Sequence, residues 1–214
     1  SDNYELGLKS QNPFGFFTFA IFQTDTKNDI VTAGTRDGRA TFRNADQTTR
    51  QGLELSWQQM IWKELNIQSS FSYIDAEFDS YTAEIANPKD STKPYAKAIN
   101  KGNKIPGVAK NQAFTRIAWQ PEQGFQAGLE ARYMDKIYVD DINSDTAPSY
   151  TVVAANVGYL WVNRDWKVNS YARVDNLFDR NYVGSVIVND GNSRFFEPVD
   201  GRNFSVGMSV TKAF

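Results

Sequence analysis

The chain has 214 residues, with 23 Lys and Arg against 25 Asp and Glu, and its formal net charge is −2. It contains neither Cys nor His, which excludes disulfides, the usual zinc sites and nucleophiles that rely on a thiol or an imidazole base. A nearly neutral chain without a basic run also lacks the charge pattern of a nucleic-acid-binding protein. We therefore expect no nucleic-acid partner, no cofactor and no enzymatic activity.

Apolar and polar residues alternate with a period of two along most of the chain, which predicts β-strands. The first strand carries Tyr4, Leu6 and Leu8 on one face, and the last carries Phe204 and Val206 on one face. In chain order, the nine predicted strands lie at about residues 4–8, 16–31, 52–57, 65–73, 113–119, 125–133, 153–161, 166–175 and 204–211. The fold class predicted is all-β.

Short and long connections alternate between these strands. The short ones fall at about residues 11–15, 58–64, 120–124 and 162–165, and the long ones at about 32–41, 80–103, 140–149 and 179–200. Outer-membrane β-barrels have short turns on one rim and long loops on the other. The pattern therefore predicts a transmembrane antiparallel barrel, although alternation alone also fits a soluble β-sandwich or a β-helix.

The stretch YLWVNRDWKV predicts a β-hairpin. With a two-residue turn at Asn163 and Arg164, Trp161 lies opposite Trp166 and Tyr159 lies opposite Val168. All five tryptophans fall within or beside the short connections, as expected for an aromatic belt at a membrane interface. The predicted belt residues are Trp57, Trp62, Trp119, Trp161 and Trp166.

An odd number of strands conflicts with the even count of a complete bacterial barrel. We therefore expect residues 1–214 to be a single, incomplete domain: the C-terminal part of a barrel whose earlier strands belong to a longer protein.

The segments RVDNLFDRNYVGS and RFFEPVDGRNFSVGMSVTKAF resemble the C-terminal end of TonB-dependent outer-membrane transporters of the ferric-siderophore type. The resemblance implies a 22-stranded barrel filled by an N-terminal plug domain, here absent. It implies that residues 176–179 and Tyr182 cap the penultimate strand, and that Phe214 is the terminal aromatic read by the barrel-assembly machinery. Lys212 departs from the apolar residue usual at its position.

The function implied is uptake of a scarce nutrient, most simply a ferric siderophore, across the outer membrane of a Gram-negative bacterium. The implied partners are outer-membrane lipid, the cargo, the TonB complex acting through the plug, the barrel-assembly machinery, and phages or bacteriocins that exploit such receptors. The alternatives are another cargo (haem, cobalamin, copper or a quinone cofactor), a passive porin or structural barrel, and a soluble β-rich carbohydrate-binding module.

Charged residues on the polar strand faces predict a wall of mixed charge lining the lumen, paired internally or with the plug. Its members are Glu54, Arg116, Glu130, Arg132, Lys167, Arg173 and Asp175. Cargo contacts are expected near the outer rim, because arginine binds anionic oxygens and aromatic rings stack on flat chelates. The candidates are Arg36, Arg39, Arg43, Tyr81, Tyr95, Tyr138, Arg194, Phe195 and Phe196.

We predict no metal site. The segment DINSD places Asp141, Asn143 and Asp145 at calcium-loop spacing, but Thr146 replaces the turn glycine and Val152 replaces the bidentate glutamate.

Overall fold

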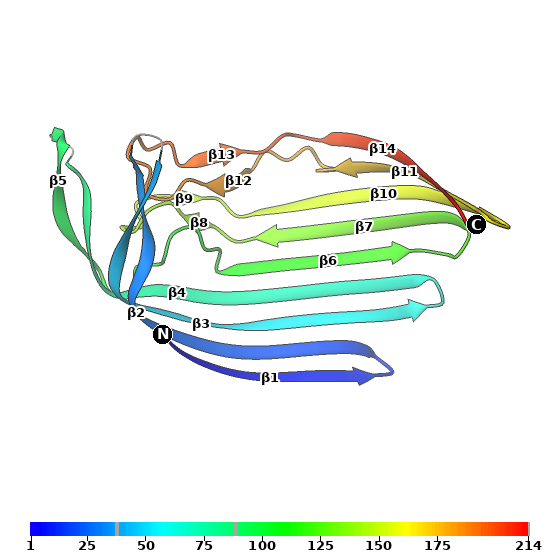
Figure 1. The fold of residues 1–214 in the computed structure, drawn as a ribbon, viewed down its shortest axis with the longest axis horizontal. Helices are drawn as coiled ribbons and strands as arrows, with labels where there is room; N and C mark the ends of the chain where they lie inside the picture. Colours follow the sequence, from blue (N-terminus) through cyan, green and yellow to red (C-terminus); the bar gives the residue numbers. More distant parts are fainter. Residues whose placement is uncertain (37–38, 88–89, 214) are drawn as a thin grey trace.

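In the computed structural model, residues 1–36, 39–87 and 90–213 are described. Within these ranges nine long strands form one antiparallel sheet in the order β1-β2-β3-β4-β6-β7-β10-β11-β14, and β5 pairs with the outer part of β4 (Figure 1). The strands are β1 (Asp2–Asn12), β2 (Gly15–Arg36), β3 (Arg39–Trp62), β4 (Leu65–Asn87), β5 (Asp90–Ile99), β6 (Asn111–Trp119), β7 (Gly124–Met134), β8 (Ile137–Tyr138), β9 (Thr146–Ala147), β10 (Tyr150–Asn163), β11 (Trp166–Asp175), β12 (Val183–Val186), β13 (Phe196–Pro198) and β14 (Asn203–Lys212). The nine predicted strands and the all-β class are confirmed.

The two ends of the sheet differ as predicted. The β1–β2, β3–β4, β6–β7 and β10–β11 turns lie at one end, and the longer connections gather at the other (Figure 1). No helix long and apolar enough to cross a membrane occurs among the described residues.

Two predicted long loops are instead strands. β2 and β3 continue as a paired hairpin to Arg36 and Arg39, and β4 and β5 occupy most of residues 80–103. Here the sequence no longer alternates regularly between apolar and polar residues, so the pattern that identifies a strand is lost while backbone pairing continues. The other two long connections contain the small hairpins β8–β9 and β12–β13.

The predicted register of the β10–β11 hairpin is wrong by two residues. The turn falls on Arg164 and Asp165, so Trp161 pairs with Val168 and Tyr159 pairs with Ser170. Arg164 adopts the left-handed conformation that such turns require, with a φ of 50°. Asp165, a residue disfavoured in strands, is thereby moved out of the ladder. A shift of two residues leaves every side chain on its predicted face.

One face of the sheet is apolar along two rows of paired residues that meet on β4. Leu6, Ile21, Leu53 and Tyr73 lie side by side on β1 to β4. The second row starts six residues away on the same face of β4 and contains Ile67, Ile117, Leu129, Ala155, Val174 and Phe204.

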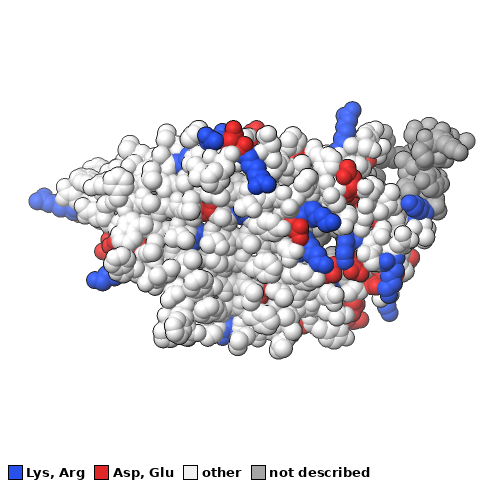
Figure 2. Space-filling view, turned by 180° about the vertical axis from the view of Figure 1, so that it is seen from behind, with Lys and Arg blue, Asp and Glu red and all other residues white. Residues whose placement is uncertain are grey.

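This apolar face is uncovered. Tyr159 is 45% exposed and Val206 is 81% exposed, and neither a helix nor a second sheet of the described residues packs on the face. In the view from behind, few charged side chains interrupt its middle, and they gather mainly toward the long-loop end (Figure 2). An apolar surface of this extent is unfavourable in water. Its medium is therefore lipid, which argues against the soluble sandwich, the β-helix and the soluble carbohydrate-binding module.

The buried apolar core lies beyond the membrane-spanning part of the strands. Phe78 is fully buried and stacks on Tyr81 with the ring centroids 4.9 Å apart. The rest of this cluster comes from the extended strands and the segment after β5: Val31, Ala45, Ala76, Ile99 and Ile105. A smaller cluster contains Ala109, Ile137 and Ala147. The outer end of the chain is thus a packed structure.

On the opposite, polar face, one glycine makes room for an aromatic ring. A Cβ atom at Gly207 of β14 would lie 2.5 Å from a ring carbon of Tyr171 on the neighbouring strand β11. Because such a contact is too short for real atoms, Tyr171 covers β14 only while position 207 lacks a side chain.

Candidate functional site

Part of the predicted lumenal charge wall forms one ion-pair cluster. The Arg173 guanidinium donates two hydrogen bonds to Glu130, at 3.0 and 3.3 Å, and lies 2.8 Å from an oxygen of Asp175. On the other side, Arg116 Nε lies 3.5 Å from Glu130 Oε1. The cluster therefore links β6, β7 and β11 across the polar face.

The small side chain of Ala154 allows this link. Ala154 of β10 pairs with Glu130 of β7 on one side, and the register places it beside Asp175 of β11 on the other. A methyl group leaves the carboxylate of Glu130 open to a guanidinium from the second strand away.

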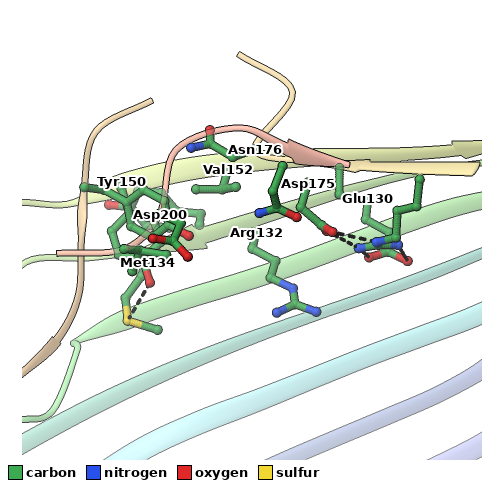
Figure 3. Close-up of a pocket in the computed structure, with 14 residues that line it drawn as sticks. Glu130, Arg132, Met134, Tyr150, Val152, Asp175, Asn176 and Asp200 are labelled. Atoms are coloured by element: carbon green, nitrogen blue, oxygen red, sulfur yellow. Dashed lines mark hydrogen bonds and ion pairs between the residues drawn. The ribbon is translucent and has the colours of Figure 1, made fainter. Parts of the chain in front are cut away.

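The remaining members of the predicted wall stand outside the cluster. Glu54 is exposed between Ala20 and Ser72 and forms no ion pair with a described residue. Lys167 is exposed near the short-turn end. The Arg132 guanidinium lies apart from the cluster (Figure 3), over the ring of Phe114 and 5.8 Å from its centroid.

A pocket of about 250 Å³ opens beside this cluster, where the spanning strands end (Figure 3). Its aromatic wall is formed by Tyr150 and Tyr182, whose ring centroids lie 4.3 Å apart. The Tyr150 hydroxyl points at Met134 Sδ, 3.7 Å away. Other lining residues include Glu130, Arg132, Arg173, Asp175, Asn176, Val199, Asp200 and Asn203. The pocket combines aromatic faces, an exposed guanidinium and several carboxylates. We refer to it as the outer-mouth pocket.

Asn176 shapes the rim of this pocket. Its side chain accepts a hydrogen bond from the Arg180 amide and donates one to the Arg180 carbonyl, both at 2.8 Å. Its φ of 50° turns the chain directly after β11. The Asp179 carboxylate in turn accepts the Arg202 amide at 2.8 Å. The DNLFDRNY segment thus closes on itself above β11 and brings Tyr182 to the pocket.

Two of the predicted cargo-contacting residues are used inside the protein. Tyr81 is 3% exposed, and burial raises the pKa of its hydroxyl. Arg43 donates a hydrogen bond to the Ala33 carbonyl at 3.0 Å. Neither side chain is presented to the outer-mouth pocket.

The other predicted loop residues are scattered over the outer end. Arg36 ends β2, Arg39 is exposed at the start of β3, and the backbone of Tyr95 lies in β5. The Tyr138 ring is 5.2 Å from Lys136 Nζ. Phe195 and Phe196 meet edge to face at 6.4 Å, next to exposed Arg194. The structure does not bring these residues together into one site.

The five tryptophans lie near the short-turn end. Trp57 donates its indole N–H to the Phe14 carbonyl at 2.8 Å, and Trp62 meets Trp119 edge to face at 6.2 Å. Trp166 lies under Lys212 Nζ at 5.3 Å, and Trp161 is 41% exposed. This placement suits side chains with an apolar body and a polar N–H. Phe214, the predicted assembly-signal residue, lies outside the described residues.

Sequence reasoning missed Met134 and Tyr150 as pocket residues and assigned Tyr182 only a capping role. Tyr150 opens β10 and carries no motif, so no sequence signal marks it. No cluster of three or more metal-binding side chains occurs in the described parts of the chain. In the DINSD segment, Asn143 is used in hydrogen bonds to Lys104.

An uncovered apolar face, a polar opposite face and the two unlike rims define an outer-membrane β-barrel wall. Residues 1–177 match the family profile "TonB dependent receptor-like, beta-barrel". The chain therefore belongs to the TonB-dependent receptor family, through its barrel domain.

Relatives and solved structures agree with this assignment. The chain is 27% identical over 165 residues to the probable TonB-dependent siderophore receptor PiuA of Acinetobacter baumannii, covering 77% of this chain and 21% of that protein. It is also 27% identical over 192 residues to the ferrichrome outer membrane transporter/phage receptor of Escherichia coli K12, covering 85% and 23%. The crystal structure of PiuA superposes with a TM-score of 0.76 at 26% identity, over 99% of this chain and 28% of that one. The chain thus spans about a quarter of these relatives.

Proposed function

We propose that this chain supplies part of the wall and outer mouth of a TonB-dependent receptor that takes up a ferric siderophore across the outer membrane. The observation that carries the proposal is the membership of the family together with relatives named as siderophore receptors. In this proposal the nine strands belong to one larger barrel domain of the plugged class.

The outer-mouth pocket is the proposed contact with the cargo. It lies on the polar face, which lines the lumen of a barrel, and at the long-loop end, from which cargo enters. Tyr150 and Tyr182 offer ring faces to a flat chelate, and Arg132 offers a guanidinium to its anionic oxygens. Because the ligands of the iron come from the siderophore, the protein needs no metal-binding residues of its own.

The polar face below the pocket is the proposed contact with the plug. Arg116 and Arg173 both form ion pairs with Glu130, and Arg173 also pairs with Asp175, whereas Glu54 and Lys167 remain exposed on the same face. Exposed charges on this face are available to the plug, through which the TonB complex acts. Phe214 is proposed as the contact with the barrel-assembly machinery, and phages or bacteriocins as users of the outer loops. We propose no enzymatic activity.

The fold by itself does not select the cargo. The copper transporter OprC superposes with a TM-score of 0.65 at 17% identity, so the same wall occurs in a protein named for another cargo. Haem, cobalamin and quinone cofactors remain alternatives for the same reason.

The test uses the full-length gene. A deletion strain should lose uptake of one radiolabelled ferric siderophore from a panel, and the wild-type gene should restore it only in cells with active TonB. Unchanged uptake of every iron chelate would contradict the siderophore assignment. Restored uptake in cells without TonB would favour the passive porin.

A further inference from the structure

The hairpin formed by β12 and β13 projects from the outer-mouth pocket and folds back onto the outer end of the protein. It consists of β12, β13 and the loop between them, residues 183–198, and we call it the arm. The residues that flank the arm, Tyr182 and Val199, both line the outer-mouth pocket. The position of the arm therefore determines one wall of the pocket.

The tip of the arm is attached through Asn189. Its side-chain amide donates hydrogen bonds to the Thr32 carbonyl at 2.7 Å and to Asp141 Oδ1 at 3.0 Å. Its side-chain oxygen accepts the Asp141 amide at 3.0 Å, and its own amide donates to the Val139 carbonyl at 3.0 Å. One residue thus joins the arm to the β2–β3 hairpin and to the segment between β8 and β9.

The fit around Asn189 is close on the side of the β2–β3 hairpin. Gly34 has a φ of 127°, and a Cβ atom there would lie 2.5 Å from the Asn189 carbonyl oxygen. The two backbones touch because position 34 has no side chain. Asp141, the partner of Asn189, is 3% exposed, so water does not substitute for the bonds that Asn189 makes to it.

Apolar contacts hold the base of the arm in the same orientation. Val183 and Val186 pack against the cluster of Ala109, Ile137 and Ala147. These contacts are non-directional, so they permit sliding, whereas the Asn189 hydrogen bonds define one position.

We propose that Asn189 is a positioning residue: it latches the arm onto the β2–β3 hairpin and the segment after β8, and so holds Tyr182 and Val199 in place as the outer wall of the pocket. The hydrogen bonds and the backbone contact of Asn189 support this positioning role without reference to any cargo. Its consequence for cargo binding rests on the proposed function.

Hydrogen exchange of the full-length receptor in detergent, without cargo, tests the latch. In Asn189→Ala, the amides of Asp141 and Asn189 and those of the arm should exchange about tenfold faster, because buried hydrogen bonds are lost. The amides of β7 and β10 should be unchanged, which shows that the variant is folded. Asn192→Ala, an exposed change on the same arm, should behave as wild type. Equal exchange of the arm in Asn189→Ala and wild type would overturn the proposal.

A charge-based rescue separates a specific latch from loose packing. Asn189→Asp places a second carboxylate against Asp141 and should release the arm at least as strongly as Asn189→Ala. Adding Asp141→Asn removes the repulsion and restores a donor and acceptor between the two positions, so part of the protection should return. If Asp141→Asn returns no protection, the proposed pair is refuted. If the arm is released while cargo affinity stays the same, the latch stands and the pocket's role in cargo binding fails.

Discussion

The guanidinium of Arg173 lies 3.0 Å from the carboxylate of Glu130, although β10 separates their strands. The β10 residue that pairs with Glu130 is Ala154, whose methyl group leaves room for the guanidinium to reach across that strand. Both side chains also line the outer-mouth pocket.

Breaking this pair should destabilise the barrel modestly. Both side chains are only partly buried, so Glu130→Gln or Arg173→Gln should each lower the free energy of unfolding by about 1–2 kcal/mol. The double variant should cost less than the sum, because the second change removes a group already left without its partner. The free energy of unfolding is measured by titrating with urea and separating the folded and unfolded forms on a gel. A double variant that loses the full sum of the two single losses would show that Glu130 and Arg173 are not coupled.

Gly207 should not tolerate a side chain. Gly207→Ala should displace the Tyr171 ring and lower stability by about 1–3 kcal/mol. Gly191→Ala is the matched control, since nothing lies within 4 Å of a Cβ there. The urea midpoint of each variant is the measurement. Tyr171→Ala should relieve most of the penalty of Gly207→Ala, and no relief would show that the ring is not the obstacle.

The β10–β11 register can be read by crosslinking, because the chain contains no cysteine. Leu160→Cys with Asn169→Cys should form a disulfide under mild oxidation, since these residues pair directly. Leu160→Cys with Lys167→Cys, on the same face but two residues away, should not. A disulfide between positions 160 and 167, and none between 160 and 169, would show that the turn lies at Asn163 and Arg164, as the sequence predicted.

The pH dependence of the outer end should carry a contribution from Asp141. Burial raises the pKa of this carboxyl above its ordinary value, so the folded protein binds the proton more tightly than the unfolded chain. The contribution of this group to stability therefore increases as pH falls through the raised pKa toward the unfolded value. Asp141→Asn, which lacks the charge, should gain stability relative to wild type at neutral pH and lose that advantage in acid. The stability of both proteins is measured by hydrogen exchange of the outer loops. A difference in stability between Asp141→Asn and wild type that is the same at pH 7 and pH 4 would contradict this prediction.

Arg132 should contribute to cargo affinity. Arg132→Gln removes the exposed guanidinium of the pocket and should weaken binding of an anionic chelate about tenfold, while folding is unchanged. Lys167→Gln removes a positive charge of the same face near the opposite end and should leave affinity unchanged. Cargo binding to the purified full-length receptor measures the affinity of both variants. An equal loss of affinity in the two variants would show that the overall positive charge of the polar face attracts the cargo, and that Arg132 does not bind it directly.

The outer loops show where prediction from sequence failed. Arg43 and Tyr81 have the side-chain chemistry of cargo contacts, yet they are used internally because the extended strands build a core beyond the membrane. Tyr150 and Tyr182, which form the pocket wall, come from the start of β10 and from the segment between β11 and β12. Residue type alone does not tell which polar and aromatic side chains of a loop face inward.

The sequence by itself determined the nine long strands of the main sheet, their faces and the lipid-facing character of one face. This is because the period-two alternation is local and survives a two-residue error in register, as between Trp161 and Val168. Only the tertiary structure decided which charges meet across β10 and that Asn189 reaches Thr32, 157 residues away in the chain. Such contacts depend on how separate loops pack at the outer end, and no local pattern encodes that packing.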